Sequence, residues 1–312
     1  MCSNNGIFYF DKADNQFKKV QGTHGQTTDF MKINGRILAV SGGMGLVELD
    51  GTEFRYIKES INYDFRANFL IMSKVDSNRL FVGLTGGTPE IASLYFNPQK
   101  DTWEIESRTT NIWPDYWGLE ETLDGRLWAN GKRAGTVDVL TPEYIDGRLD
   151  LDASPVQTYD QSDGLPDDIY MWTINDSLEF GKQNTNQTFK YSSKLDSFIP
   201  SQSQYLGEVD TTGNISAYPV TDQYGRMWFA NGSVKSIGQK SVEGIQEISN
   251  DALLELSSTP IWYIYPEESN TLEKSITWFA GPDGLFRYEG NLEAPKIPNF
   301  EVLLRSMQVG DD

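Results

Sequence analysis

The chain has 312 residues, of which 45 are acidic and 26 are basic, so its formal net charge at pH 7 is −19. This charge argues against nucleic-acid and anionic-membrane partners, because both require a surface rich in lysine and arginine. With one cysteine, Cys2, and one histidine, His24, the chain can form no internal disulfide and cannot assemble a zinc, haem or iron–sulfur centre. We therefore expect no metal and no cofactor.

The first residues predict part of a sheet. Residues 1–6 lack the basic and apolar regions of a secretion signal, and no stretch of the chain is apolar enough to span a bilayer. Residues 6–11 and 16–20 each have the composition of a strand, so residues 6–20 predict a partial blade. We expect the chain to be a fragment of a longer protein, or one whose leader has been removed.

One short phrase then recurs along the chain. Its clearest copies are Gly-Arg-Leu-Trp-Ala-Asn at 125–130 and Gly-Arg-Met-Trp-Phe-Ala at 225–230. Six copies begin at residues 35, 78, 125, 176, 225 and 275, so the steps between them are 43, 47, 51, 49 and 50 residues. A repeat of about 40–50 residues built from short strands is typical of a β-propeller blade.

Residues 116–159 show how one unit is built. Asp124-Gly125 predicts a tight turn, because both residue types tolerate the positive φ angles of a short hairpin. Strand-like runs lie around this turn and the one after it, at 116–122, 126–129, 136–140 and 155–159. The unit therefore predicts one blade of four antiparallel strands.

An aromatic residue recurs in the second strand of the units. A bulky ring is needed there because adjacent twisted sheets leave a wedge of space between them. We therefore expect the recurring aromatics to belong to the core rather than to contact a ligand. They are Phe81, Trp128, Trp228 and Trp278.

The predicted fold class is all-β, a β-propeller of four-stranded antiparallel blades. We expect seven blades, with six as the alternative. The propeller is predicted over 1–292, with a partial blade at 6–20 and units near 29–58, 66–107, 116–159, 168–200, 213–250 and 260–292. Residues 293–312 predict a proline-containing linker, followed by a closing strand or the start of a further domain.

Several phrases resemble the repeats of two-component regulator propellers. They are Asp-Gly-Leu-Pro-Asp-Asp-Ile-Tyr at 163–170, Asp-Gly-Arg-Leu-Trp at 124–128 and Gly-Leu-Phe-Arg-Tyr-Glu-Gly at 284–290. Residues 297–310 resemble the start of the three-tyrosine domain that follows such propellers. The sequence departs from the pattern at Glu179, where the family has an aromatic residue.

This resemblance implies a periplasmic or otherwise extracytoplasmic ligand-sensing domain. In such regulators the propeller precedes a membrane helix and an output module, for example a histidine kinase, so the output module of a longer parent protein is an implied partner. Several members respond to oligosaccharides, which makes an oligosaccharide or another small molecule the expected ligand. Pairing of two copies across a two-fold axis is a further expectation.

Binding without catalysis is the expected activity, and two alternatives stay open. A propeller hydrolase or lyase could use two facing carboxylates, since the chain has 45 acidic residues. Catalysis through histidine is disfavoured, because His24 lies in a loop between two glycines and is expected to be solvated. The other alternative is a scaffold for protein partners, which would need an exposed apolar patch on its loops.

The ligand site is expected on one face of the propeller. There the loops that lead into each innermost strand and the loops that join strands two and three surround the central channel. Aromatic faces in these loops can stack on sugar rings, while charged and amide groups bind hydroxyls or a uronate. The predicted ligand-binding residues are Trp113, Asp115, Tyr116, Trp117, Lys132, Arg133, Asp168, Tyr170, Gln183, Asn184 and Asp283; we predict no catalytic residue and no metal ligand.

Overall fold

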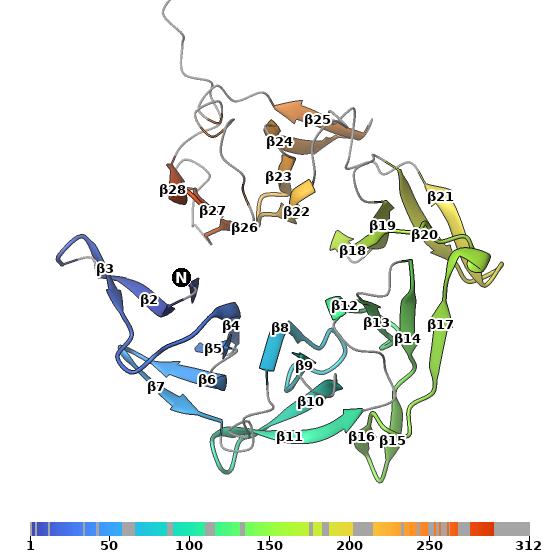
Figure 1. Cartoon of the computed structure of the whole chain (residues 1–312), viewed down its shortest axis with the longest axis horizontal. Coiled ribbons are helices and arrows are strands. Elements are labelled where there is room, and N and C mark those ends of the chain that lie inside the picture. Colours follow the sequence, from blue (N-terminus) through green and yellow to red (C-terminus); the bar gives the residue numbers. More distant parts are fainter. Residues whose placement is uncertain are drawn as a thin grey trace, which may run out of the picture. The chain divides into compact units, whose positions relative to one another are not determined.

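The computed structural model describes a chain of β-strands (Figure 1). The described residues are 2–3, 5–11, 13–33, 35–41, 44–57, 66–85, 90–109, 116–131, 135–174, 177–182, 187–201, 215–231, 234–241, 244–248, 253, 256, 261, 263–267 and 275–289. Among them, the one regular helix has three residues, Gln161–Asp163. The chain divides into two compact units, Met1–Ser203 (unit 1) and Gln204–Asp312 (unit 2).

Unit 1 contains a three-stranded sheet and then four four-stranded blades in chain order. The three-stranded sheet consists of β1 (Cys2–Ser3), β2 (Gly6–Asp11) and β3 (Gln16–Lys19). Blade 1 is β4 (Thr27–Ile33), β5 (Arg36–Ser41), β6 (Gly45–Asp50) and β7 (Glu53–Tyr56); blade 2 is β8 (Arg66–Met72), β9 (Arg79–Thr85), β10 (Glu90–Asn97) and β11 (Thr102–Thr109). Blade 3 is β12 (Tyr116–Glu121), β13 (Leu127–Gly131), β14 (Val137–Leu140) and β17 (Val156–Tyr159); blade 4 is β18 (Ile169–Ile174), β19 (Ser177–Lys182), β20 (Thr188–Ser192) and β21 (Ser197–Ser201).

Unit 2 contains one four-stranded blade and one three-stranded sheet. Blade 5 is β22 (Ile215–Thr221), β23 (Arg226–Asn231), β24 (Val234–Ser241) and β25 (Gly244–Ile248). The three-stranded sheet consists of β26 (Tyr263–Pro266), β27 (Ile276–Gly281) and β28 (Gly284–Glu289). Every pair of neighbouring strands within a sheet is antiparallel, as predicted.

The described residues form five four-stranded blades, so the prediction of seven blades, with six as the alternative, is wrong in number. The residues expected to form a partial blade, 6–20, lie in a three-stranded sheet, and the described strands of the unit expected near 260–292 form another. The recurring phrase marks only one turn and the strand after it, and such a hairpin joins a sheet whether or not a fourth strand follows. Counting phrases therefore overestimates the number of complete blades. The predicted linker and closing strand at 293–312 lie outside the described residues.

The phrase recurs because it is a hydrogen-bonded turn that also supports a tryptophan. In blade 3, the Thr122 amide donates to the Arg126 carbonyl over 3.0 Å, and the Gly125 amide donates to the Thr122 carbonyl over 2.8 Å. Gly125 has φ 84°, a left-handed conformation that favours glycine. The indole N–H of Trp128 donates to Thr122 Oγ1 over 3.3 Å, so the turn satisfies the one polar group of the buried ring.

In unit 2, carboxylates accept the indole N–H of the corresponding tryptophans. Asp222 takes the place of the threonine, and its Oδ2 accepts the indole N–H of Trp228 over 3.0 Å. In the last sheet, Glu267 Oε1 accepts the indole N–H of Trp278 over 2.5 Å, although the loop between the two residues is longer. The repeat in the sequence therefore records one local hydrogen-bonding pattern.

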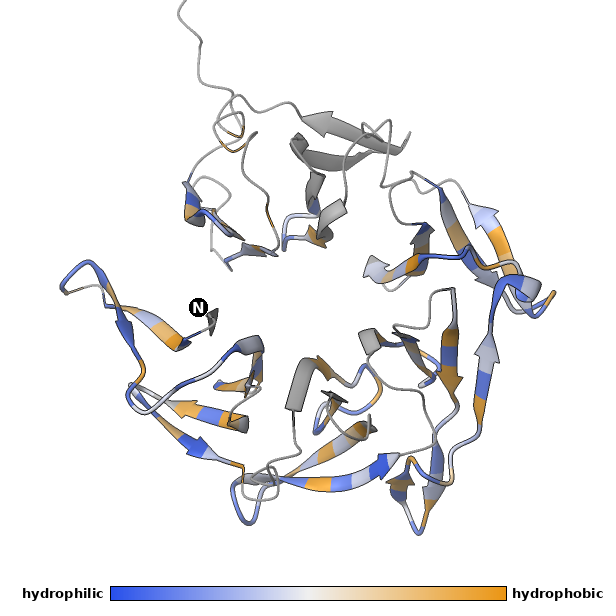
Figure 2. Cartoon of the chain, in the orientation of Figure 1, coloured by the Kyte–Doolittle hydropathy of each residue, from blue (hydrophilic) through white to orange (hydrophobic). Residues whose placement is uncertain are grey.

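Trp128 occupies the wedge between blades 3 and 4, as predicted. Its side chain belongs to β13 and is 1% exposed. It lies 5.0–6.4 Å, measured between ring centroids, from the aromatic rings that surround it: Tyr159 of its own blade, and Phe180, Tyr191 and Phe198 of blade 4. Apolar side chains of neighbouring blades in unit 1 pack together in shared core clusters, and apolar segments recur along the strands (Figure 2).

The other recurring aromatics divide into two groups. Phe81 and Trp228 are buried like Trp128, which confirms them as core residues. Trp278 is only partly buried, and its neighbour Phe279 enters the core instead, 5.8 Å from the Trp228 ring. Both residues lie on β27, and successive side chains of a strand point to opposite faces of the sheet. Phe279 therefore points toward Trp228, and Trp278 points to the other face.

A second recurring turn joins the last two strands of three sheets, and its repetition escaped the sequence analysis. Asn15, Asp101 and Asp196 occupy corresponding positions in it and have φ values of 54°, 54° and 50°. Asparagine and aspartate tolerate this left-handed conformation better than other non-glycine residues. The turn also links blades, because the Tyr159 hydroxyl of blade 3 donates to Asp196 Oδ1 of blade 4 over 2.7 Å.

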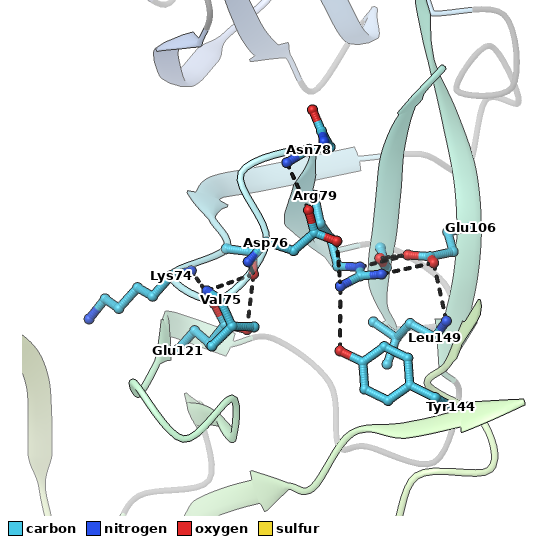
Figure 3. Close-up of polar contacts among 11 residues, drawn as sticks. Lys74, Val75, Asp76, Asn78, Arg79, Glu106, Glu121, Tyr144 and Leu149 are labelled. Carbon is cyan, nitrogen blue, oxygen red and sulfur yellow. Dashed lines mark hydrogen bonds and ion pairs between the residues drawn. The ribbon is translucent and has the colours of Figure 1, made fainter. Parts of the chain in front are cut away.

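Blade 3 carries an inserted hairpin, β15 (Glu143–Ile145) and β16 (Arg148–Asp150), that lies against β11 of blade 2. Figure 3 shows the buried ion pair beneath it. Arg79 Nε donates to Glu106 Oε2 over 2.8 Å, and both side chains are 5% exposed. The Leu149 amide of the hairpin donates to Glu106 Oε1 over 3.1 Å, and the ring of Tyr144 covers the guanidinium group. The hairpin therefore protects the outermost strand of blade 2.

Candidate functional site

We call the side on which the chain approaches the innermost strand of each blade, and on which strands two and three are joined, the approach face. The inner strands of unit 1 share a β-bulge near this face. In β4 the pairing skips from Thr27 to Asp29 and leaves Thr28 as the extra residue. The same skip leaves Asn68 extra in β8 and Trp117 in β12, whereas β18 pairs without a bulge. Bulges turn side chains toward new directions and are common beside binding sites.

The structure places part of the predicted ligand set. Tyr116 and Trp117 form the start of β12, with Trp117 at the bulge. Asp168 is exposed and Tyr170 partly buried where the chain enters β18. Asp283 is exposed in the turn between β27 and β28 of unit 2. The remaining predicted residues lie outside the described part of the chain: Trp113, Asp115, Lys132, Arg133, Gln183 and Asn184.

Two loops of the approach face meet between blades 3 and 4. Gly135, in the loop between β13 and β14, has φ 76°, and a Cβ atom on it would lie 2.9 Å from the Pro166 carbonyl oxygen. Lys182, at the end of β19, binds Asp167 with an Nζ–Oδ1 distance of 2.9 Å. The loop that leads into β18 therefore lies against the joining loop of blade 3 and is tied to the end of β19. This junction is the candidate functional site.

Asn130 lies inside this junction and was missed by the sequence analysis. It is the last residue of the recurring phrase in blade 3, and it is 3% exposed. Its Nδ2 donates to the Ile169 carbonyl of blade 4 over 3.2 Å. The copies of the phrase in blades 1 and 2 have Val40 and Gly83 at this position. A polar residue in an otherwise apolar or glycine position was the available signal.

Asp29 is a second site feature that the sequence analysis did not identify. It follows the bulge of β4, and its two carboxylate oxygens accept the amides of Phe30 and Leu70 over 2.8 and 2.9 Å. Leu70 belongs to blade 2, so Asp29 links two inner strands. Burial raises the pKa of Asp29 to about 6, although both backbone hydrogen bonds act in the opposite direction. The carboxyl group therefore titrates close to neutral pH.

Asp29→Asn should change how stability depends on pH. The folded pKa of about 6 lies above the reference value of 3.8, so wild-type stability decreases as the pH rises through this interval, whereas an amide does not titrate. We expect the unfolding free energy of the variant, relative to wild type, to rise by up to roughly 3 kcal/mol between pH 4 and pH 7. Urea unfolding at a series of pH values measures the difference. Parallel curves for the variant and the wild type would contradict this prediction.

Two further carboxylates lie on β12 toward its other end. Glu120 accepts the Thr173 hydroxyl over 2.8 Å, and Glu121 accepts the Ser73 hydroxyl over 3.2 Å and the Lys74 amide. Burial raises the pKa of both glutamates, while these hydrogen bonds partly offset it. Because their partners lie in blades 2 and 4, we interpret both glutamates as links between inner strands.

The described residues offer little for metal or histidine chemistry. They contain no group of three or more histidine, cysteine or acidic side chains placed to hold a metal ion. His24 is exposed, and its Nδ1 lies 3.2 Å from the Gly22 carbonyl oxygen. None of the helices in this described part is both long enough and apolar enough for a membrane span.

No protein-family model and no curated protein sequence matches the chain. Among solved structures, the extracellular domain of the hybrid two-component system BT4673 from B. thetaiotaomicron has a TM-score of 0.56 at 12% identity over 91% of this chain. Virginiamycin B lyase from Staphylococcus aureus, solved as an inactive variant with quinupristin, has a TM-score of 0.54 at 12% identity, covering 86% of this chain and 84% of the lyase. Saccharomyces cerevisiae Sqt1 has a TM-score of 0.58 at 10% identity, covering 92% of this chain and 90% of Sqt1.

These similarities show the fold. The chain is all-β, and its mostly four-stranded antiparallel sheets are arranged as a propeller. The chain spans about a third, 35%, of the BT4673 extracellular domain. At identities of 10–12%, the activity of any of these proteins is not transferred to this chain by similarity alone.

Proposed function

We propose that this chain is an extracytoplasmic ligand-sensing propeller domain of a bacterial two-component or related signal-transduction regulator, and that its ligand is an oligosaccharide. The meeting of two loops at Gly135 and Pro166 carries the proposal, because it gathers the approach-face loops of blades 3 and 4 into one place. The loop into β18 contains the phrase at 163–170 that resembles regulator propellers. A similar fold in the extracellular domain of a two-component system supports the same assignment.

The residue types around this junction suit a sugar. Aromatic residues precede and begin β12, and a sugar ring can stack on an aromatic face. Lysine and arginine follow β13, and they can bind the carboxylate of an acidic sugar. The proposed ligand residues of this site are Trp113, Asp115, Tyr116, Trp117, Lys132, Arg133, Asp168, Tyr170, Gln183 and Asn184; Asp283, the remaining predicted residue, belongs to unit 2 and is left out of the site.

Signalling would depend on a longer parent protein. In this proposal, ligand binding changes the orientation of the segment after Pro295, and an output module that follows it responds. Two copies paired across a two-fold axis would couple two output modules in the same step. The oligosaccharide, the output module and the second copy are thus the three partners that the proposal names.

A thermal-shift screen tests the ligand. The protein is heated with maltotriose, cellotriose, xylotriose or trigalacturonic acid at millimolar concentration. A ligand present at about 100 times its Kd stabilises the folded state by about 2.7 kcal/mol, which raises the unfolding midpoint by several degrees. Trp113→Ala should abolish the shift, because it removes a proposed stacking surface.

Phe17→Ala is the matched control for this screen. Phe17 is an exposed aromatic residue, at 43% exposure, and it lies on β3 beside Phe10, away from the proposed site. The control should keep the full shift. If no neutral or acidic saccharide shifts the wild-type midpoint, the proposed ligand class is wrong.

A propeller hydrolase or lyase is the second candidate function. Asp29 favours it, since a carboxyl group with a pKa near neutral can act as a general acid or base. The similar lyase loses its activity when one histidine becomes alanine, and the histidine of this chain, His24, is exposed in a loop. An enzyme would shorten the bound saccharide, so chromatography after incubation separates the two functions. Turnover that Asp29→Asn abolishes would favour catalysis over sensing.

A further inference from the structure

Blade 3 contains a buried amide group with an unused acceptor. Gly118 follows the bulge of β12 and pairs with Asn130 of β13. A Cβ atom on Gly118 would lie 2.7 Å from Asn130 Oδ1, so the asparagine side chain fills the space that the glycine leaves. Asn130 Nδ2 donates to the Ile169 carbonyl, whereas Oδ1 is buried and accepts no hydrogen bond from the residues that the structure describes. Half of the amide is therefore satisfied and half is not.

The corresponding pairs in the other blades of unit 1 avoid this situation. Val40 lies opposite Asp29 in blade 1, and it is fully buried. A glycine lies opposite the inner strand in blade 2, at Gly83, and in blade 4, at Gly181. An apolar residue or a glycine thus suits this position structurally. Asparagine adds a polar group that costs free energy when it is left without a partner.

The position of Asn130 connects it to the proposed ligand site. Gly118, which it covers, directly follows Trp117, and Ile169, which it binds, lies between Asp168 and Tyr170. A methionine of blade 4 lies next to Gly118: Met171 Cε would be 3.8 Å from a Cβ atom on this glycine. Methionine has a flexible, unbranched side chain, so it can move aside more readily than the backbone around it.

We propose that Asn130 is a specificity-determining residue of the ligand site, and that its Oδ1 accepts a hydrogen bond from a hydroxyl group of the bound saccharide. This inference rests on the proposed sensing function. A site that hydrogen-bonds a ligand hydroxyl in a buried position strongly rejects analogues that lack it, because the polar group is otherwise left unpaired. The ligand contact must be a donor, so a hydroxyl satisfies Oδ1 and an ionised carboxylate does not.

Asn130→Val tests the inference, because valine is what blade 1 has at the corresponding position. We expect the unfolding midpoint without ligand to fall by no more than about 4 °C, because the variant removes the unsatisfied Oδ1 together with the hydrogen bond from Nδ2 to the Ile169 carbonyl. We also expect the variant to bind the best saccharide of the panel at least about tenfold more weakly by calorimetric titration, because one buried hydrogen bond is lost. Gly118→Ala should weaken binding too, since its Cβ displaces the amide.

Thr277→Val is the matched control. Thr277 is 1% exposed and lies in unit 2, and its hydroxyl also lacks a hydrogen-bond partner among the described residues. This variant should keep both its midpoint and the saccharide affinity. A midpoint lowered by more than about 4 °C in Asn130→Val would show that the amide is a structural element and overturn the inference.

The saccharide results separate this inference from the proposed function. If wild type binds a saccharide and Asn130→Val binds it equally well, the sensing proposal stands and the role of Asn130 is wrong. If wild type binds none of the four saccharides, the carbohydrate-sensing proposal fails, and the role of Asn130 fails with it. Loss of binding in Asn130→Val, with a preserved midpoint, supports both.

Discussion

Trp128→Ala should lower the free energy of unfolding by about 3–5 kcal/mol, the range for replacing a large buried aromatic residue by alanine. Trp128 is 1% exposed and lies among four aromatic rings that belong to blades 3 and 4. Its removal leaves a cavity between two blades and deprives Thr122 Oγ1 of its indole donor. Urea unfolding at pH 7, followed by fluorescence and by circular dichroism, measures the loss.

A second tryptophan provides the comparison. Trp278 occupies the corresponding place in the recurring phrase but is only partly buried. Trp278→Ala should therefore cost clearly less than Trp128→Ala, about 1–2 kcal/mol. Equal losses for the two variants would mean that the wedge between blades 3 and 4 does not depend on the indole ring.

Glu106→Ala is expected to have an effect of similar size, about 3–5 kcal/mol, because it leaves the buried guanidinium group of Arg79 without its carboxylate. Both side chains are 5% exposed (Figure 3). Glu106 also accepts the Ser93 hydroxyl over 2.8 Å and the Leu149 amide over 3.1 Å, so its loss also removes one hydrogen bond between blade 2 and the inserted hairpin. Urea unfolding at pH 7 measures the destabilisation.

Two comparisons isolate the buried charge. In the double variant Arg79→Met/Glu106→Ala, no unpaired guanidinium group remains, so part of the lost stability should return. Glu104 lies on the same strand as Glu106 and is the partly exposed partner of Lys100, so Glu104→Ala should cost less than about 1 kcal/mol. A double variant as unstable as the sum of its two single variants would contradict the role of the ion pair.

Acid should weaken this region as well. Burial opposes ionisation of Glu106, but hydrogen bonds from Arg79, Ser93 and Leu149 outweigh it and hold its pKa below the reference value of 4.5. Its contribution to stability is therefore complete above pH 4.5 and is lost as the pH falls through the lowered pKa. This dependence has the opposite sign to that of Asp29, so the two carboxyl groups can be distinguished by titration.

The strands were predictable because their signals are local. Asp124-Gly125 and Trp128 identify a turn and a core strand within five residues, and β13, β14 and β17 lie where the pattern places them. The number of blades was not predictable in the same way. A turn phrase at Ser275 starts a hairpin equally well in a four-stranded blade and in the three-stranded sheet that the structure shows.

The candidate site was predictable only in part. Asp168 and Tyr170 belong to the phrase at 163–170, which resembles the entry to a propeller blade, so the sequence predicted that they lie on the approach face. No recognisable sequence phrase marks Asn130 or Asp29 as a site residue. Their roles depend on a bulge in the inner strand and on atoms of the next blade, namely the Ile169 carbonyl and the Leu70 amide.

The amino-acid sequence by itself determined that this protein is built from repeated antiparallel hairpins, because each turn and each core tryptophan is specified by residues close together in the chain. Only the tertiary structure decided how many hairpins become complete blades, which tryptophan is buried, and which polar groups meet between blades. The physical reason is the distance along the sequence between the residues that interact. Strand register and burial depend on partners such as Gly118 and Met171, which lie 53 residues apart in the sequence yet pack against each other at one junction.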